Sequence, residues 1–178
     1  FEASQPMAIT CFLRDITERR QAEDALQQSE KRLRQIIDLV PHFIFAKDID
    51  GRFVLVNQAV ADTYGTTVKE LTGKTDADFA SPEEVRHFRS KDLEVINSGK
   101  PAVIPEELIT DADGHTRRLS TIKIPFTFSG TTLPAVLGVS VDITERKQME
   151  EQLQRSETRY RAIVEDQTDL VCRMLPDG

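Results

Sequence analysis

The sequence predicts an α+β domain, a small antiparallel sheet with helices on one face, flanked on each side by a long charged helix. Three observations lead to this prediction. Within 178 residues, apolar runs and turn residues mark two strands, then several helices, then three strands. A segment near each end has the periodicity of a long helix, and the two segments repeat one another. Antiparallel strands with helices segregated to one face give the α+β class.

The repeat sets the domain boundaries. The sequence DITERRQAEDALQQSE (residues 15–30) returns as DITERKQMEEQLQRSE (residues 142–157), with 11 of 16 positions identical. The offset, 142 minus 15, is 127 residues. Solenoid repeats are usually about 20–50 residues long, so this repeat indicates tandem domains. Five segments are expected: the tail of a preceding unit (1–14), a linker helix (15–40), one complete domain (41–142), a second linker helix (143–166) and the start of a following unit (167–178).

Each repeated segment carries a heptad pattern. Mostly apolar residues recur at alternating spacings of four and three, with Ser29 and Ser156 at one position of each seam, while the other faces are dense with charge. A stripe this narrow predicts a parallel two-helix coiled coil, and hence a homodimer through the flanking helices; the alternative is a helix that packs on its own domain. The seam residues are Ala22, Leu26, Leu33 and Ile36 in the first copy and Met149, Leu153, Tyr160 and Ile163 in the second.

The start of each linker helix is a candidate signal-relay joint. The strand AVLGVSV (residues 135–141) runs directly into Asp142-Ile143-Thr144, which leaves little slack between sheet and helix. Asp142 or Thr144 can cap the first free N–H groups, and Glu145 suits the positive end of the helix dipole. The joint residues are Asp142, Thr144, Glu145 and Arg146, with Asp15, Thr17 and Arg19 at the equivalent positions of the first copy.

The complete domain opens with a hairpin. Two mostly apolar runs, residues 43–47 and 52–57, flank the segment Asp48-Ile49-Asp50-Gly51. Asp-Gly between two apolar runs is a strong hairpin signal because glycine accepts a positive φ. Asn57 then ends the second strand and can cap a helix over residues 58–64, which Gly65 stops.

Two short helical pieces, a longer helix and three strands follow. Ser81 can cap the longer helix, with Pro82 in its first position and acidic residues in its first turn. Glycine and proline after residue 97 break that helix, and Asp-Gly and Ser-Gly turns separate the strands. The expected bounds are 67–71 and 75–79 for the short pieces, 81–97 for the helix, and 102–110, 116–128 and 133–142 for the strands.

Taken in order, these motifs resemble a PAS domain, the sensory module of bacterial signalling proteins. They are Asp50-Gly51, Asn57, Tyr64-Gly65, Gly73–Asp76, Asn97–Pro101, Asp113-Gly114 and Gly138–Arg146. The resemblance implies a five-stranded antiparallel sheet in the order 2-1-5-4-3, with a pocket between sheet and helices. It also implies adjacent PAS units and coiled-coil linkers to a distant effector, commonly a histidine kinase and less often a diguanylate cyclase.

Composition and motifs narrow the function. The formal charge of −7 disfavours nucleic acid and anionic lipid as partners, because either needs a cationic face. The longest mostly apolar stretch, residues 133–141, is far shorter than the roughly 20 residues of a membrane span, and no signal peptide is visible. A cytoplasmic location is therefore expected. Phosphate-binding, metalloprotease and nucleophile-elbow motifs are missing, so any enzyme activity is expected elsewhere in the parent protein.

No cofactor or metal is expected. Blue-light sensors of the family bond flavin through a cysteine, but no cysteine lies between Cys11 and Cys172, which excludes a covalent flavin adduct. Haem-binding relatives use a histidine on the long helix, where His87 lies, but residues 102–110 offer no cation for the haem propionates. The two cysteines are expected to be free thiols.

A small-molecule pocket between sheet and helices is the remaining candidate site. By spacing alone its apolar residues build a core, which a domain of this size needs for stability. Lys123 either leaves the strand on the solvent face or pairs with an acid, and we favour the solvent face. The candidate ligand-binding residues are Phe45, Phe53, Leu55, Asn57, Tyr64, Asp76, Phe79, His87, Ile122 and Lys123.

Two functions of different classes are left open. In the first, the domain binds a small cytoplasmic ligand and passes a conformational change through the joint into the helix. In the second, it is a ligand-free dimerisation and spacer module that relays signals between neighbouring units. A void of a few hundred Å³ with converging polar groups favours the first, and a filled interior favours the second.

Overall fold

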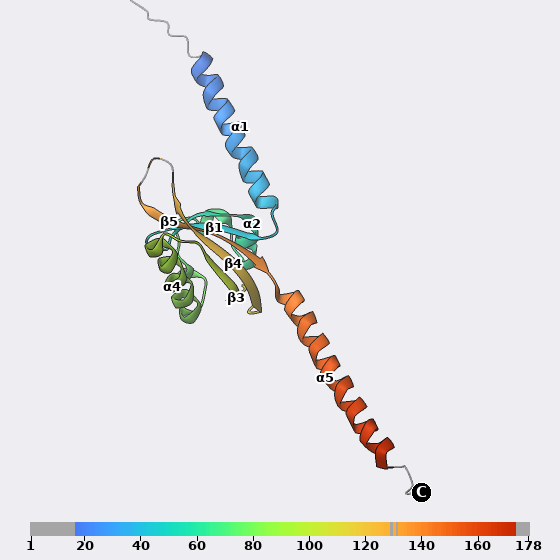
Figure 1. Ribbon diagram of the computed structural model, residues 1–178. Helices are drawn as coiled ribbons and strands as arrows, with labels where there is room; N and C mark the ends of the chain where they lie inside the picture. Colours follow the sequence, from blue (N-terminus) through green and yellow to red (C-terminus); the bar gives the residue numbers. More distant parts are fainter. Residues whose placement is uncertain (1–16, 129, 131, 174–178) are drawn as a thin grey trace, which may run out of the picture. The chain divides into compact units, whose positions relative to one another are not determined.

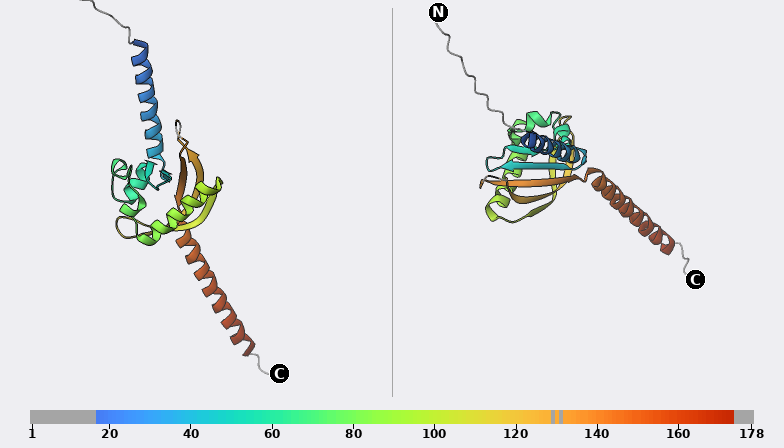
Figure 2. Two further views of the ribbon diagram at one scale, coloured as in Figure 1. Left: turned by 90° about the vertical axis from the view of Figure 1, so that its left-hand side faces the viewer. Right: turned by 90° about the horizontal axis from the view of Figure 1, so that it is seen from above.

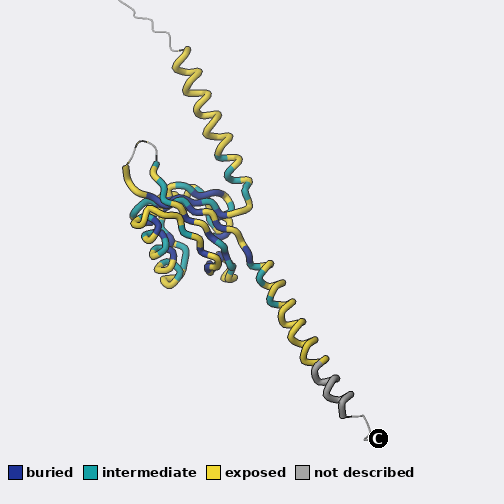
Figure 3. Tube along the Cα trace, in the orientation of Figure 1, coloured by how far each residue is buried: buried dark blue, intermediate teal, exposed yellow. Residues whose placement is uncertain are grey.

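The computed structural model describes residues 17–128, 130 and 132–173 (Figure 1). The chain divides into two compact units, residues 1–36 and 37–178. The first unit holds most of helix α1 (Thr17–Leu39), which contains no buried residue and is exposed along nearly all of its length (Figure 3). The second unit holds the sheet, the shorter helices and helix α5 (Thr144–Arg173).

Five antiparallel strands form one sheet in the second unit. Their order is β2-β1-β5-β4-β3, which confirms the predicted order. The last strand, β5, pairs with both β1 and β4, so the beginning and the end of the domain are neighbours in the sheet. The strands are β1 (Phe43–Asp48), β2 (Phe53–Val56), β3 (Ala102–Thr110), β4 (Thr116–Thr127) and β5 (Pro134–Asp142), each end within one residue of its predicted position.

Helices gather on one face of this sheet (Figure 2). They are α2 (Gln58–Thr63), α3 (Val68–Leu71), the 3-10 helix η1 (Asp76–Asp78) and α4 (Pro82–Ser98). Helix α4 contacts β3, β4 and β5, while α2 contacts β1. The hydrophobic core between helices and sheet includes Phe45, Phe53, Val56, Leu71 and Phe88.

Side-chain caps explain where these helices begin and end. The Asn57 carboxamide oxygen accepts a hydrogen bond from the backbone N–H of Val60 at the start of α2. Ser81 and Glu84 form a reciprocal capping box at the start of α4, where Pro82 occupies the first turn. Gly99 ends α4 in the left-handed conformation, with φ 63°, as a C-terminal glycine commonly does.

Strand β4 turns its polar side chains inward. Lys123 is buried under the helices, whereas Ile122 is 52% exposed and Ile124 37% exposed on the opposite face. The prediction that Lys123 faces solvent is therefore wrong, and Ile122 does not line the interior. Because side chains alternate along a strand, a shift of one residue reverses every assignment. The acid that permits burial of the lysine comes from α4, so strand periodicity alone could not indicate it.

A bulge in β3 brings a carboxylate into the interior. The register between β3 and β4 shifts between Ile104 and Glu107, around Pro105, which has no N–H for the strand ladder. Strict alternation from Ile104 would turn Glu107 outward. With the bulge, Ile104, Glu107 and Ile109 are all buried.

Helix α5 runs to Arg173, beyond the boundary expected at residue 166. In the first copy Pro41 follows the end of α1, and a proline cannot continue a helix. Its counterpart 127 residues later is Thr168, which imposes no such stop. The expectations for residues 1–14, Cys11, Asp15 and the side chain of Cys172 lie outside the described residues. None of the helices in the described ranges is long and apolar enough to cross a bilayer.

Candidate functional site

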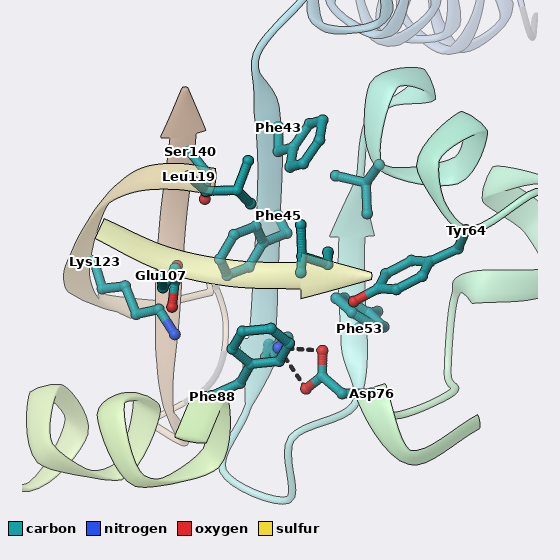
Figure 4. Close-up of a pocket in the computed structure, with 13 residues that line it drawn as sticks. Phe43, Phe45, Phe53, Tyr64, Asp76, Phe88, Glu107, Leu119, Lys123 and Ser140 are labelled. Carbon is teal, nitrogen blue, oxygen red and sulfur yellow. Dashed lines mark hydrogen bonds and ion pairs between the residues drawn. The ribbon is translucent and has the colours of Figure 1, made fainter. Parts of the chain in front are cut away.

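A small cavity lies between the sheet and the helices (Figure 4). Its volume is about 40 Å³, room for a few water molecules at most, whereas small-molecule sites usually measure about 300–1,000 Å³. The interior is therefore almost filled. The cavity is lined by the rings of Phe43, Phe45, Phe53, Tyr64 and Phe88, the aliphatic Val60, Ile109 and Leu119, and the polar Lys47, Asp76, Glu107, Lys123 and Ser140.

Four buried charged side chains form a chain of ion pairs beside the cavity. Lys47 Nζ donates to both carboxylate oxygens of Asp76, at 2.8 and 2.6 Å, and lies 3.5 Å from Asp92 Oδ2. Lys123 Nζ donates to Asp92 Oδ1 at 2.6 Å. Asp92 thus links helix α4 to β1 and β4, the two strands on either side of β5.

Aromatic rings surround the Lys47 ammonium. Its Nζ lies 5.1, 4.7 and 5.8 Å from the ring centroids of Phe45, Phe53 and Phe88. The face of an aromatic ring attracts a cation, most strongly where water is excluded. Burial alone would lower the pKa of Lys47, but the two carboxylates paired with it raise that pKa above its ordinary value. Lys47 therefore stays charged at neutral pH.

Tyr64 forms another wall of the cavity, on the side of Asp76 (Figure 4). Burial raises the pKa of its phenol well above the ordinary value, and the nearby carboxylates of Asp76, Glu84 and Glu107 raise it further. The hydroxyl is therefore a neutral group at neutral pH.

Glu107 is incompletely paired. Its Oε1 accepts a hydrogen bond from the Thr121 hydroxyl, which lies 2.8 Å from the Ser140 hydroxyl. Its Oε2 is buried and has no hydrogen-bond partner within the described ranges. His87 Nε2 lies 3.5 Å from Oε2, in a contact that does not form a hydrogen bond. Buried carboxylates are normally paired, so this oxygen is an acceptor with unused hydrogen-bonding capacity. Glu107 lines both the cavity and the surface groove that contains His87.

Half of the predicted ligand-binding residues line the cavity: Phe45, Phe53, Tyr64, Asp76 and Lys123. The other five, Leu55, Asn57, Phe79, His87 and Ile122, are not among the lining residues. Phe79 packs against the ring of Tyr64, with centroids 5.5 Å apart. His87 lines a surface groove with Glu83 and Glu84, and Glu107 lies between this groove and the cavity, lining both.

Asn57 has a structural role in place of the predicted ligand contact. Its Oδ1 accepts from the backbone N–H of Ile44 at 3.1 Å, in addition to capping α2. Its Nδ2 donates to the carbonyls of Ile37, Val40 and His42, at 3.2, 3.1 and 2.8 Å. This one side chain therefore holds the segment before β1 against the start of α2.

Lys47 and Glu107 are the most informative lining residues that were not predicted. A period of two from Phe43 through Phe45 places Lys47 on the inner face of β1, so the sequence did contain that signal. For Glu107 the signal is Pro105, because a proline within a strand indicates a bulge, and a bulge here turns Glu107 inward. Phe43, Val60, Ile109, Leu119 and Ser140 were also not singled out.

The joint between β5 and α5 is fastened to β4. Ile143 N donates to the carbonyl of Arg118 at 2.8 Å, and Arg118 N donates to Thr144 Oγ1 at 2.8 Å. Asp142 Oδ1 accepts from the N–H of Thr144 at 2.9 Å, so Asp142 satisfies the first free N–H group of the helix. Ile143 is buried.

Ion pairs extend this attachment to the body of the helix. The Arg118 guanidinium lies 2.7 Å from Glu151 Oε1 on α5 and 3.3 Å from Glu106 Oε1 on β3. Lys147 Nζ, also on α5, lies 3.6 Å from Glu106 Oε2. The first two turns of α5 are therefore connected to β3 and β4 as well as to β5.

The remaining joint and seam residues point to solvent. Glu145 and Arg146 are exposed, and Arg19 pairs with Glu23 at 2.7 Å on the surface of α1. The exposed seam residues are Ala22, Leu26, Leu33, Ile36, Met149, Leu153, Tyr160 and Ile163. Among the residues that the structure describes, nothing covers either seam.

One cluster of metal-ligating side chains occurs in the described ranges, at the β3–β4 turn: Asp111, Asp113 and His115. Asp111 Oδ1 accepts from the N–H groups of His115 and Asp113, at 2.9 and 3.1 Å, and Oδ2 accepts from Arg117 Nε at 3.0 Å. The His115 N–H and the Arg117 contact hold the pKa of Asp111 below its usual range, although burial opposes them. These bonds explain the cluster as part of the turn.

Comparison with known proteins identifies the fold. The PAS fold family matches residues 37–148. The chain is 30% identical over 144 residues to virulence sensor protein BvgS of Bordetella pertussis, covering 79% of this chain and 12% of BvgS. It is 32% identical over 123 residues to the methanogenesis regulatory histidine kinase FilI of Methanothrix harundinacea, covering 69% of this chain and 14% of FilI.

A solved structure agrees with this assignment. The PAS domain of Bordetella pertussis BvgS superposes with a TM-score of 0.54 at 29% identity, covering 74% of this chain and 98% of that structure. The chain spans about one-eighth of the length of BvgS and of FilI. Because the family match covers more than half of the chain and the sheet has the expected order, this chain belongs to the PAS family of signalling domains.

Proposed function

We propose that this chain is a cytoplasmic signal-relay module of a sensor histidine kinase, in which a change in the sheet moves helix α5 through the joint at Asp142–Thr144. The observation that carries the proposal is the double attachment of the joint to Arg118, through the Ile143 N–H and the Thr144 hydroxyl. The relatives named as a virulence sensor and a regulatory histidine kinase support a kinase as the parent protein.

The path of the relay follows strand β4. Lys123 near one end of the strand pairs with Asp92 of α4, and Arg118 near the other end holds the joint. A displacement of α4 against the sheet would therefore act on the strand that positions α5. Only Ile143 separates Asp142 from the helix start, so little flexible chain is available to absorb the movement.

The output of the relay would pass along a coiled coil. The exposed seam residues of α5, among them Met149 and Leu153, form an apolar stripe on a charged helix and support pairing with a second copy of the chain. A rotation or shift at the joint would then reach the next domain through two paired helices. The seam of α1 supports the same arrangement for the preceding linker.

The small cavity favours a relay that works without a ligand of ordinary metabolite size. A volume of about 40 Å³ cannot hold a drug-sized molecule. The converging polar groups of Lys123, Asp76 and Glu107 would nevertheless orient a molecule of a few heavy atoms. We therefore limit any ligand of this cavity to a few heavy atoms.

We also propose that the domain works without haem or a covalent flavin. His87 is half-exposed and lines the surface groove with Glu83 rather than the cavity. The rings of Phe45, Phe53 and Phe88 already enclose the Lys47 ammonium, which leaves no space for a planar cofactor.

Insertions into α5 test the relay in the full-length parent protein. One residue inserted between Thr144 and Met149 rotates the following seam by about 100°, whereas seven residues restore its phase. Autophosphorylation should change with the single insertion and remain close to the unaltered level with seven. Equal effects of the two insertions would contradict a phase-dependent relay.

A matched pair of threonine variants tests the joint. Thr144→Val removes the acceptor for the Arg118 N–H, while Thr158→Val removes a hydroxyl from an exposed turn of the same helix. Thr144→Val should alter kinase output and Thr158→Val should not, with both proteins folded by circular dichroism. Equal output from the two variants would argue against the joint.

A further inference from the structure

We propose that the interior cavity binds a small primary ammonium ion, no larger than about methylammonium, with Glu107 Oε2 as its acceptor. This proposal goes beyond the relay, because it names a ligand that could start the signal. Binding of that ligand can be measured on the isolated chain whether or not the relay is correct. Three features of the buried site lead to it: its charge balance, its unpaired acceptor and its aromatic walls.

The buried charges do not balance. The carboxylates of Asp76, Asp92 and Glu107 face only two buried ammonium groups, those of Lys47 and Lys123. Both ammonium groups are bound to aspartates, and neither forms an ion pair with Glu107. One formal negative charge is left in the interior, and an uncompensated buried charge is strongly unfavourable. An anionic ligand would add to this charge, whereas a cation would neutralise it.

The acceptor is fixed in position. Glu107 Oε1 is held by the Thr121 hydroxyl, while Oε2 is buried and accepts no hydrogen bond from the described residues. His87 is a basic group close to it, but its Nε2 at 3.5 Å makes no hydrogen bond. That contact is an ion pair only if His87 is protonated.

The walls suit an ammonium group of limited size. Phe45 and Phe88 line the cavity, and their rings already lie within 6 Å of both lysine ammonium groups, at 5.1 to 5.9 Å from centroid to Nζ. Rings that attract these cations would attract another. The volume of about 40 Å³ sets the size limit.

Thermal unfolding and calorimetry on the chain at pH 8 test the proposal, with four salts at equal ionic strength. Methylammonium chloride should raise the Tm saturably above its value in sodium chloride. Tetramethylammonium chloride, which has the same charge but is too large and has no N–H, should not, and nor should sodium acetate. Equal effects of methylammonium and tetramethylammonium would overturn the proposal, and this comparison needs no variant.

Two matched variants test Glu107 as the acceptor. Glu107→Gln keeps the shape but removes the charge, and should weaken methylammonium binding at least about tenfold. Glu83→Gln changes an exposed glutamate of the surface groove and should bind like the unaltered chain. Binding retained by Glu107→Gln, or lost equally in both variants, would show that the ion does not occupy this cavity.

Discussion

The two faces of the sheet differ, and along β4 the usual distribution of polarity between them is reversed. The face under α4 carries the buried ion pairs of Lys47 and Lys123, whereas the opposite face exposes apolar side chains. Those exposed residues include Val103, Leu108, Ile122, Ile124, Val139 and Val141. Polarity along β4 therefore does not tell which face is inside. What decides burial is whether a partner is available, and Asp92 supplies that partner from α4.

The two faces also differ in what they contribute to the stability of the domain and to the specificity of its packing. Burying ion pairs is weak evidence for stability, because desolvation offsets much of their attraction. Removing one member is nevertheless expensive, since the other charges remain buried. The inner face therefore fixes how α4 sits on β1 and β4, while the outer face can change with little effect on folding.

The largest effect is expected for Asp92→Ala. Asp92 is the partner of Lys123 and a second partner of Lys47, so its loss leaves buried ammonium charge uncompensated. The free energy of unfolding should fall by about 3–5 kcal/mol, measured by urea denaturation. Glu94→Ala on the same helix removes only the exposed pair with Lys91 and should change stability by less than about 1 kcal/mol. Similar losses for the two variants would contradict the role of the buried pairs.

A somewhat smaller loss of stability is expected for Asn57→Ala. This variant tests whether a buried uncharged polar side chain stabilises the domain as much as the buried ion pairs do. Asn57 is fully buried, and its loss leaves backbone N–H and C=O groups around it without partners. Each such group costs about 1–3 kcal/mol, and water can reach some of them, so we expect a loss of about 2–4 kcal/mol. Gln58→Ala, at the exposed neighbouring position, is the control and should change little. A loss below about 1 kcal/mol for Asn57→Ala would show that the carbonyls find other donors.

The sequence was sufficient for the elements and their order because local chemistry marks them. Gly51 and Gly99 adopt positive φ at the hairpin and at the end of α4, and Ser81 caps that helix as its type and position indicate. These signals act within a few residues, so the strand and helix ends were predicted within one residue inside the domain.

The buried charges were not predictable in the same way. Lys47 meets Asp76 across 29 residues and Asp92 across 45, and Lys123 meets Asp92 across 31, all separations that no local pattern encodes. A buried lysine without a paired acid is unfavourable, so the local pattern alone favours an exposed Lys123. Glu107 depended on a bulge that shifts the alternation of its strand.

Alkaline pH should weaken the inner face, and Tyr64 should contribute to that loss. The pKa of Tyr64 is raised in the folded state, first by burial and then by neighbouring carboxylates, and that of Lys47 is raised by its paired aspartates. The stability due to each group is fully present below its ordinary pKa and is lost as the pH rises through the folded value. The free energy of unfolding should therefore fall above about pH 10.

Tyr64→Phe isolates the tyrosine part of this dependence. Without the phenol, the decline between about pH 10 and 12 should be shallower, by at most about 1.4 kcal/mol per pH unit. Tyr160→Phe, at an exposed position on α5, is the control and should keep the original slope. Superimposable curves for Tyr64→Phe and the unaltered chain would mean that Tyr64 ionises equally readily in both states.

The smallest effect is expected on the outer face, where Ile122→Lys places a charge beside the buried Lys123. Ile122 is more than half exposed, so the new ammonium can reach water and the free energy of unfolding should change by no more than about 0.5 kcal/mol. Leu119→Lys introduces the same group three residues away on the inner face, where Leu119 is buried opposite Glu107 of β3. Pairing with Glu107 offsets part of the cost of burying this ammonium, but the longer side chain must still fit into a packed core, so that variant should lose more than about 1 kcal/mol. If instead the two variants lost similar stability in the isolated chain, the outer face would be packed like the inner one, and polarity would not be reversed across β4.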